Sequence, residues 1–327
     1  MVSNDDIARA AALLRAGEVV AFPTETVYGL GADASNPAAV AKIYALKGRP
    51  STHPVIVHLA SAAQLSAWVL DVPERAATLA ARFWPGPLTM IFRRSALVPD
   101  IVTGGQDSVA IRVPVHPVAQ ALLQAFGGGI AGPSANRFGH VSATTADHVR
   151  SEFGDDVPFI LEGGDCDVGI ESTIVDIRGG QPVLLRPGGV SIEALRAVLN
   201  EEIARPGETA PRAPGTLKAH YAPGTPLMLV EPDVALELVH SLARQGKRLA
   251  VLSFSALQPL VSGLTWRVAS TAAEAYAHAL YANLRDLDAA RADMIIVERP
   301  PERAEWSAIL DRLTRAAAGS AGEDDEP

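Results

Sequence analysis

The sequence predicts an α/β protein with two domains: a larger one built on a twisted mixed sheet with surrounding helices, and a smaller one built on a parallel sheet. Short segments rich in Val, Ile and Leu alternate irregularly with helical segments up to about residue 200. A stretch dense in Pro and Gly follows, and strands and helices then alternate regularly. The 327 residues are also enough for two domains, which usually have about 100–200 residues each.

The predicted first domain covers residues 1–200. Its first helix begins with Ser3 and Asp6 in the spacing of a capping box and ends at Gly17. The strand candidates are EVVAF, HPVIVHL, LTMIF, SVAIRVP, PFILEG, STIVDI and PVLLRP. The further helix candidates are Pro37–Leu46, Pro73–Phe83, Pro117–Phe126, Thr145–Phe153 and Ile192–Leu199. Because these elements are too irregularly spaced for a simple strand–helix–strand repeat, a mixed sheet is expected.

Residues 201–224 are predicted to form a linker, because they are dense in Pro and Gly and lack apolar periodicity. The sequence HYAP near its end suggests that this end docks onto another part of the protein. Strands PLMLV, RLAVLSF and DMIIVE then alternate with helices Asp233–Gln245, Thr271–Leu287 and Glu302–Ala317. This pattern predicts a small Rossmann-like parallel α/β domain at 225–317, followed by a flexible tail at 318–327.

The composition argues against several classes of protein. Acidic residues outnumber basic ones by 37 to 28, and the net charge of -9 disfavours non-specific binding of nucleic acid. The only cysteine, Cys166, cannot build a disulfide framework or a cysteine metal site, which fits a reducing cytosol. Asp5 and Asp6 stand where a secretory signal would carry basic residues, and no apolar run approaches the ~20 residues of a membrane helix. We therefore expect a cytoplasmic protein that does not enter a membrane.

The segment YALKGRPSTHPVIVHL gathers basic residues in this acidic chain. Lys47 followed by Gly48 is also an ordinary helix end, so Lys47 alone does not indicate a ligand. Arg49, His53 and His58 have no such explanation. Two cations and a histidine within a few loop residues favour a phosphate site over a metal site. His58 lies in an apolar strand, where a lone histidine is more often a hydrogen-bonded core residue than a ligand.

Two further segments leave two interpretations open. FPTETVYGLGADA places Thr24, Thr26 and Tyr28 at alternate positions, either to bind a polar ligand on one face or to favour a strand. Arg112 lies in the apolar strand SVAIRVP and needs a carboxylate partner, because a buried guanidinium is costly alone. That carboxylate could belong to a ligand or to an internal ion pair.

Small polar residues follow other predicted strands. AGPSANRFGHVSATT offers Ser134, Asn136 and Ser142, which could donate to phosphate or sugar oxygens or could simply cap a turn. GGDCDVGIESTIVDI carries Ser172 in a loop, and LLRPGG carries Arg186 at the end of a strand. Each of these signals is weak by itself.

Together, PTETVYGLG, KGRP, HPVIVH, FWPGPLT, VAIRVP, GPSAN and ESTIVD resemble the YrdC-like domain. With PGTLKAHYAP and the small α/β domain, the chain resembles the two-domain form of the threonylcarbamoyl-AMP synthase family as far as about Leu313. One departure is that the family often has Pro within the segment Ser142–Thr144. The resemblance implies a nucleotidyltransferase that condenses L-threonine, bicarbonate and ATP into threonylcarbamoyl-AMP and releases pyrophosphate.

The resemblance also implies partners and a cofactor. A tRNA threonylcarbamoyl transferase complex would move the group to adenosine 37 of tRNAs that read codons beginning with A, so stable tRNA binding by this chain is not expected. Mg²⁺ should accompany ATP, with phosphate oxygens as most of its ligands. No dedicated metal site of the protein is expected.

Site residues follow from the same resemblance. The implied threonine site consists of Thr26, His58, Arg112, Gly132 and Ser172, with Arg112 facing the carboxylate. The implied ATP site consists of Lys47, Arg49, His53, Ser108, Ser134, Asn136, Ser142, Arg186 and Tyr221. Lys47 and Arg49 would be the catalytic pair, because they would neutralise phosphate oxygens as the carbamate attacks the α-phosphorus. No general base or nucleophile stands out, and the HYAP segment would close over the site as a lid.

Two other functions are alternatives to the synthase reaction. Carbamoyl transfer in hydrogenase maturation uses a related domain, but those longer proteins carry cysteine-rich zinc modules, and this chain has one cysteine. A non-catalytic RNA-binding module is the second alternative. The net charge and the absence of an aromatic and basic platform argue against it.

Overall fold

The computed structural model describes residues 2–207 and 210–320, which form two compact units. The first unit comprises the chain up to Phe138 together with Ser142–Thr216, and the second comprises Gly139–Val141 and the chain from Leu217 onwards. The division between them falls inside the segment 201–224 that was predicted to be a linker.

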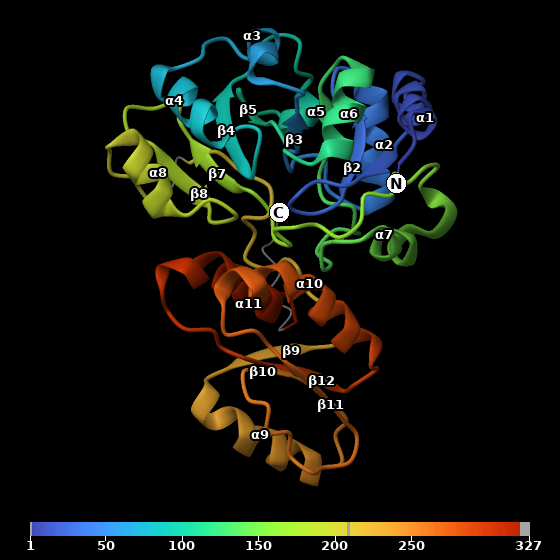
Figure 1. Ribbon diagram of the computed structural model, residues 1–327, viewed down its shortest axis with the longest axis vertical. Helices are drawn as coiled ribbons and strands as arrows, with labels where there is room; N and C mark the ends of the chain where they lie inside the picture. Colours follow the sequence, from blue (N-terminus) through green and yellow to red (C-terminus); the bar gives the residue numbers. More distant parts are fainter. Residues whose placement is uncertain (1, 208–209, 321–327) are drawn as a thin grey trace. The chain divides into compact units, whose positions relative to one another are not determined.

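The first unit is built on a mixed sheet of eight strands among the described residues, which confirms the predicted fold class (Figure 1). The spatial order is β1-β2-β6-β3-β5-β4-β7-β8. β3 runs parallel to β5 and β4 runs parallel to β7, whereas the other neighbouring pairs are antiparallel. The strands are β1 (Val20–Phe22), β2 (Gly29–Asp33), β3 (Ile56–His58), β4 (Leu88–Arg93), β5 (Ser108–Arg112), β6 (Ile130–Ala131), β7 (Thr173–Asp176) and β8 (Val183–Arg186).

Helices surround this sheet, and their ends follow the sequence signals. In the capping box of α1, the Ser3 hydroxyl accepts from the Asp6 N–H, and the Asp6 carboxylate accepts from the Ser3 N–H. α2 begins after Asn36, whose side chain caps it, and ends at Gly48 with φ 62°. The helices are α1 (Asn4–Arg15), α2 (Pro37–Lys47), α3 (Leu65–Trp68), α4 (Glu74–Phe83), α5 (Asp100–Thr103), α6 (Pro117–Phe126), α7 (Ala146–Phe153) and α8 (Ile192–Leu199), with short 3-10 turns at Ala62–Gln64 and Gly154–Asp156.

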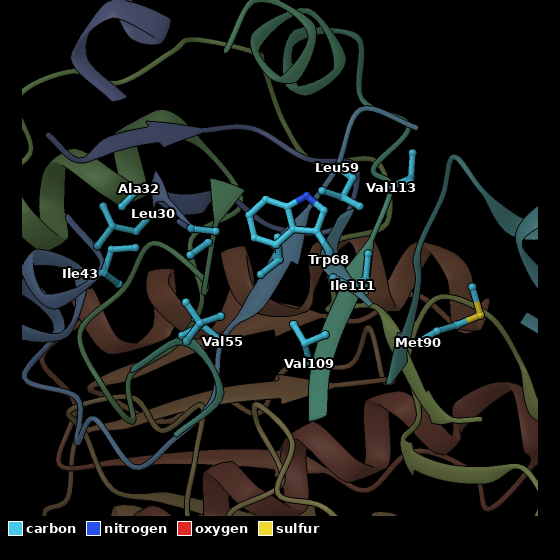
Figure 2. Close-up of a cluster of buried hydrophobic side chains, with 14 of the residues drawn as sticks. Leu30, Ala32, Ile43, Val55, Leu59, Trp68, Met90, Val109, Ile111 and Val113 are labelled. Carbon is cyan, nitrogen blue, oxygen red and sulfur yellow. The ribbon is translucent and has the colours of Figure 1, made fainter. Parts of the chain in front are cut away.

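The two faces of the sheet pack against different partners. β5 turns Val109 and Ile111 into a large apolar cluster (Figure 2). Because side chains alternate along a strand, Ala110 points to the opposite face. There it packs with Ile56 of β3 and with Ala213, a residue of the segment 201–216 that follows α8. Residues 210–216 of the predicted linker therefore belong to the first unit, and Ala213 packs on this face of its sheet.

Two predictions for this unit were wrong. PFILEG does not form a strand, because only Ile160 pairs, as an isolated bridge with Ala21. β2 was not predicted, whereas β6 is the strand that was expected to end before Gly132. Glycine is usually depleted in strands, but in β2 a Cβ at Gly31 would lie 2.8 Å from the Phe22 ring. The packing of the Phe22 ring thus requires glycine at position 31, and this glycine is also the reason why the sequence did not predict a strand here.

The second unit is a parallel sheet of four strands, in the order β11-β10-β12-β9, as expected for a small Rossmann-like domain. The strands are β9 (Leu227–Val230), β10 (Leu249–Ser253), β11 (Leu264–Val268) and β12 (Met294–Glu298), and the helices are α9 (Pro232–Arg244), α10 (Ala273–Ala289) and α11 (Ser307–Ser320), with a 3-10 turn at Ala304–Trp306. β11 was not predicted, because this edge strand leaves most of its side chains exposed or half-buried. Since α11 runs to Ser320, it includes the start of the predicted tail, and 321–327 lie outside the described residues. None of the helices in the described ranges combines the length and the apolar character needed to span a membrane.

Two glycines that end helices allow a test of close packing in the first unit. Gly104 ends α5 with φ 61°, and Gly127 ends α6 with φ 82°. A Cβ at Gly104 would lie 2.2 Å from the Thr52 carbonyl oxygen, whereas one at Gly127 would meet no atom within 4 Å. We expect Gly127→Ala to lower the free energy of unfolding by about 1 kcal/mol, the ordinary cost of a left-handed alanine. Gly104→Ala should lower it by roughly 3 kcal/mol or more, because the loop must also move. Urea denaturation measures both, and equal losses would show that the loop around Thr52 relaxes freely.

Candidate active site

Arg112, the last residue of β5, is buried and contacts three separate parts of the first unit. Its Nη1 donates to the Thr26 hydroxyl at 2.7 Å, and its Nε donates to the Gly86 carbonyl oxygen at 3.3 Å. Its Nη2 lies 2.7 Å from Oε1 of Glu25, and both side chains of this ion pair are almost completely buried. Of the two interpretations left open by the sequence, the internal ion pair is therefore present.

The register of the sheet brings other polar side chains to this arginine. β3 pairs His58 with Arg112, and β4 pairs Thr89 with Arg112 from the other side. The Thr89 hydroxyl lies 2.8 Å from the hydroxyl of Ser172, which immediately precedes β7. Gly132 follows β6, and a Cβ there would lie 3.0 Å from Nδ1 of His58, so the ring packs against bare backbone. The five residues predicted to hold threonine therefore come together around one buried guanidinium.

Arg186 and Ser142 extend this group of side chains. Arg186, at the end of β8, donates from Nε and Nη2 to the Ser172 carbonyl oxygen and from Nη1 to the Pro214 carbonyl oxygen. Ser142 donates from its hydroxyl to Oε1 of Glu171 at 2.6 Å. Glu171 precedes Ser172 in the chain, and the Ser172 hydroxyl contacts Thr89. Both contacts therefore lie beside the group of side chains around Arg112.

Lys47 anchors a second group of predicted residues. Its Nζ donates to the carbonyl oxygen of Ser134 at 2.7 Å and to that of Asn136. The sequence singled out the side chains of Ser134 and Asn136, but it is their backbone that holds Lys47. Burial lowers the pKa of Lys47 well below its ordinary value, and the neighbouring Arg49 lowers it further.

Arg49 and His53 lie in the loop after α2 and share a contact with Phe138. The Arg49 guanidinium is 5.5 Å from the centre of the Phe138 ring, and Nη2 donates to the Pro54 carbonyl oxygen at 2.9 Å. The His53 ring meets the same aromatic ring edge-on at 5.4 Å. Burial lowers the pKa of His53, and Arg49 and Arg212 add to this effect. One cation, Arg49, and a histidine that favours its neutral form thus contact one aromatic ring.

The two groups are joined by the loop that follows β6. Gly132 touches His58 at one end of this loop, and the carbonyl oxygens of Ser134 and Asn136 hold Lys47 at the other. Within the first unit, GPSAN therefore connects the predicted threonine residues to the predicted phosphate cations.

Two predicted ATP residues belong to neither of these groups. Ser108 is on the same face of β5 as Arg112 but four residues earlier, a separation of about 13 Å along a strand. Tyr221 belongs to the second unit, where its ring stacks on Tyr281 at 5.8 Å and lies 5.1 Å below the Arg312 guanidinium. Their roles in binding ATP stay predictions.

Sequence reasoning missed Glu25 and Thr89. Glu25 lies between Thr24 and Thr26 in PTET. This segment was interpreted through its alternating hydroxyl groups, and that interpretation gave the carboxylate no role. The one available signal was the need of Arg112 for a carboxylate partner, which does not say which carboxylate of the chain it is. Thr89 gave no signal, since threonine is common in strands.

No nucleophile or metal cluster emerges among the described residues. Cys166 is buried, and burial raises the pKa of its thiol, so it remains protonated. No group of three His, Cys, Asp or Glu side chains in the described ranges could hold a metal ion. The arrangement is suited to positioning a ligand carboxylate and phosphates by fixed charges.

The fold and the site define a class of protein: a mixed-sheet α/β domain with a group of buried cations, followed by a small parallel α/β domain. Residues 12–188 match the family model Sua5–YciO–YrdC, described as telomere recombination. Residues 190–318 match the C-terminal domain of threonylcarbamoyl-AMP synthase. The chain belongs to the Sua5–YciO–YrdC family, in the form that carries this second domain.

Relatives and a solved structure are similar over nearly their whole length. The threonylcarbamoyl-AMP synthase of Bacillus subtilis (strain 168) is 43% identical over 328 residues, covering 97% of this chain and 94% of the relative. That of Pyrococcus abyssi (strain GE5 / Orsay) is 39% identical over 323 residues, covering 94% and 93%. The crystal structure of P. abyssi Sua5 complexed with L-threonine has a TM-score of 0.90 and 37% identity, covering 98% of this chain and 96% of that one.

The buried His58 predicts a pH dependence of stability. Burial lowers its pKa from 6.5 to about 3, and Arg112 contributes to the shift. Below pH 6.5 the unfolded chain takes up a proton at this residue and the folded one does not, so stability falls as the pH falls towards 3. Between pH 6.5 and 4.5 this residue should account for a loss of about 2 kcal/mol.

The measurement is urea denaturation of the unsubstituted protein and of His58→Gln at the two pH values. Other groups, including His53 and His116, stay in both proteins, so only the difference between their pH profiles is assigned to His58. The unsubstituted protein should lose about 2 kcal/mol more than His58→Gln. Parallel profiles would mean that His58 is protonated as easily in the folded state as in the unfolded one.

Proposed function

We propose that this protein is an L-threonylcarbamoyladenylate synthase, which condenses L-threonine, bicarbonate and ATP into threonylcarbamoyl-AMP and releases pyrophosphate. The observation that carries the proposal is the buried Arg112, surrounded by polar side chains from several strands and loops. It occurs in a chain that is 37% identical to a Sua5 structure complexed with L-threonine and 39–43% identical to synthases over most of its length.

Arg112 would hold the carboxylate of L-threonine. A guanidinium has five N–H donors, and two of these donate to the Thr26 hydroxyl and the Gly86 carbonyl oxygen. Nη2 faces Glu25 as an ion pair but makes no hydrogen bond with the described residues, so both of its N–H groups and one on Nη1 remain. A carboxylate binds a guanidinium best through two parallel bonds. The hydroxyl groups of Thr26 and Ser172 and the backbone at Gly132 would surround the rest of the amino acid.

Lys47 and Arg49 would act on the phosphates. The amino nitrogen of threonine first forms a bond with the carbon of bicarbonate as water leaves. A carbamate oxygen then forms a bond with the α-phosphorus of ATP as the bond to pyrophosphate breaks. Both partners of this second step are anions, and their repulsion grows where water is excluded. The negative charge of the phosphates would favour the protonated form of Lys47, whose pKa is lowered by burial.

The other proposed ATP residues are His53, Ser108, Ser134, Asn136, Ser142, Arg186 and Tyr221. Mg²⁺ would enter with ATP and neutralise the pyrophosphate leaving group. Phosphate oxygens would be most of its ligands, because the described residues offer no protein cluster for a metal. No step of the proposal depends on a protein ligand to this ion.

The product would be passed on rather than kept. We place the reaction in the cytoplasm, and a tRNA threonylcarbamoyl transferase complex would use the mixed anhydride to modify adenosine 37 of tRNAs that read codons beginning with A. This chain itself need not bind tRNA stably, which agrees with its net charge of -9. High identity to synthases over nearly the full chain favours this function over an RNA-binding module or a carbamoyl-transfer maturation factor.

The first test is the dependence of pyrophosphate release on each substrate. With ATP and bicarbonate present, L-threonine should give the fastest release among the amino acids, because the site offers both a guanidinium and hydroxyl groups. Omission of bicarbonate should reduce the rate to background. Salt-sensitive binding of tRNA without threonine-dependent release of pyrophosphate would instead support the RNA-binding alternative.

The second test compares two lysines of α2. Lys42 is exposed and paired with Glu18, whereas Lys47 is buried against two carbonyl oxygens. Lys47→Met keeps most of the methylene packing but removes the cation, so pyrophosphate release should fall by about 100-fold or more. Lys42→Met should release pyrophosphate at the unsubstituted rate. Circular dichroism of both variants checks that they are folded, and a folded Lys47→Met with normal turnover would remove Lys47 from the proposed mechanism.

A further inference from the structure

Glu25 is a buried carboxylate that the proposed reaction has not used. Its side chain is 3% exposed, and its Oε1 lies 2.7 Å from Nη2 of Arg112. Its Oε2 accepts from the Val115 N–H at 3.2 Å, and its carbonyl oxygen accepts from the Val168 N–H at 2.7 Å. Both the side chain and the backbone of Glu25 are therefore fixed within the first unit.

Arg112 keeps its orientation through contacts other than Glu25. It donates from Nη1 to the Thr26 hydroxyl, which lies 2.9 Å from the Thr24 hydroxyl, and Thr24 donates to the Val27 carbonyl oxygen at 2.6 Å. Since Thr24 uses its proton on Val27, Thr26 must donate to Thr24 and accept from the arginine. This chain of hydrogen bonds, together with the Gly86 carbonyl, fixes the guanidinium at Nη1 and Nε. The special contribution of Glu25 is therefore its charge.

A buried guanidinium without an opposite charge is strongly destabilising. In the free protein Glu25 supplies that charge. A threonine carboxylate on the N–H groups that donate to neither Thr26 nor Gly86 would bring a second negative charge to the same cation. Two carboxylates that share one site repel each other.

We propose that Glu25 is the resident counter-ion of Arg112, which stabilises the free protein and at the same time weakens the binding of the amino acid's carboxylate. The inference rests on the proposed function, because it takes the threonine carboxylate as the second anion. Glu25 is a positioning residue in this account: it acts on the substrate through Arg112 and sets the affinity of the site.

The test is the neutral, nearly isosteric variant Glu25→Gln, which can still accept from the Val115 N–H. Its melting temperature without ligand should be lower than that of the unsubstituted protein. Its Kd for L-threonine, measured by isothermal titration calorimetry, should nevertheless be lower by about tenfold, because the competing charge is gone. L-Threoninamide, which has no carboxylate, should not gain affinity. Glu18→Gln, at an exposed carboxylate paired with Lys42, is the matched control and should change neither property.

The possible outcomes separate the inference from the proposed function. A residue that only supports the fold would lower the melting temperature and leave threonine binding unchanged or weaker, and that result would overturn the inference. If Glu25→Gln does not fold, Glu25→Asp keeps the charge but withdraws it from Arg112, and it should bind threonine more tightly than the unsubstituted protein; equal or weaker binding overturns the inference in the same way. Failure of the unsubstituted protein to bind threonine or to release threonine-dependent pyrophosphate would reject the proposed function itself.

Discussion

The buried guanidinium of Arg112 is the constraint on which the site depends. A buried arginine at the end of a central strand needs an opposite charge and fixed hydrogen-bond acceptors. The loop after β1 supplies the Glu25 carboxylate and the Thr26 hydroxyl, and the Gly86 carbonyl oxygen before β4 accepts from Nε. Nη2 has the charge of Glu25 beside it but no hydrogen-bond partner in the part of the chain that the structure describes. The strand register then adds His58 and Thr89 on either side. These contacts offset the free-energy cost of burying the guanidinium, and they also hold it in one orientation.

A second constraint follows from the chemistry of two anions. The residues around Arg112 suit an amino acid carboxylate, and Lys47 and Arg49 suit phosphates. The loop Gly132–Asn136 touches both groups, because it contacts His58 at its first residue and Lys47 through later carbonyl oxygens. A short, hydrogen-bonded loop of this kind fixes one group relative to the other, which is what catalysis by positioning requires.

Much of this could be predicted from sequence because the signals were local. The capping box at Ser3 and the helix end at Gly48 depend on neighbouring residues alone, and both are present in the structure. β2 was missed because its glycines serve the packing of Phe22, a contact between strands. Glu25 was missed for a related reason: its partner Arg112 lies far along the chain, and nothing near Glu25 shows that the carboxylate is buried. Contacts between residues that are far apart in the chain could not be predicted from the single sequence.

The segment after α8 packs on the face of the sheet that carries His58, Thr89 and Arg112, so it is part of the first unit's structure. His58, Thr89 and Arg112 each lie two positions from an apolar residue of the same strand, so they share its face. Those apolar residues are Ile56, Ile91 and Ala110, and Ala213 packs on them. Pro214 accepts a hydrogen bond from Arg186, and Arg212 exchanges backbone hydrogen bonds with the Gln106 side chain. The segment thus covers the apolar part of the face that bears Arg112. A segment packed in this way can exclude water from that face of the sheet, which a flexible linker would not do.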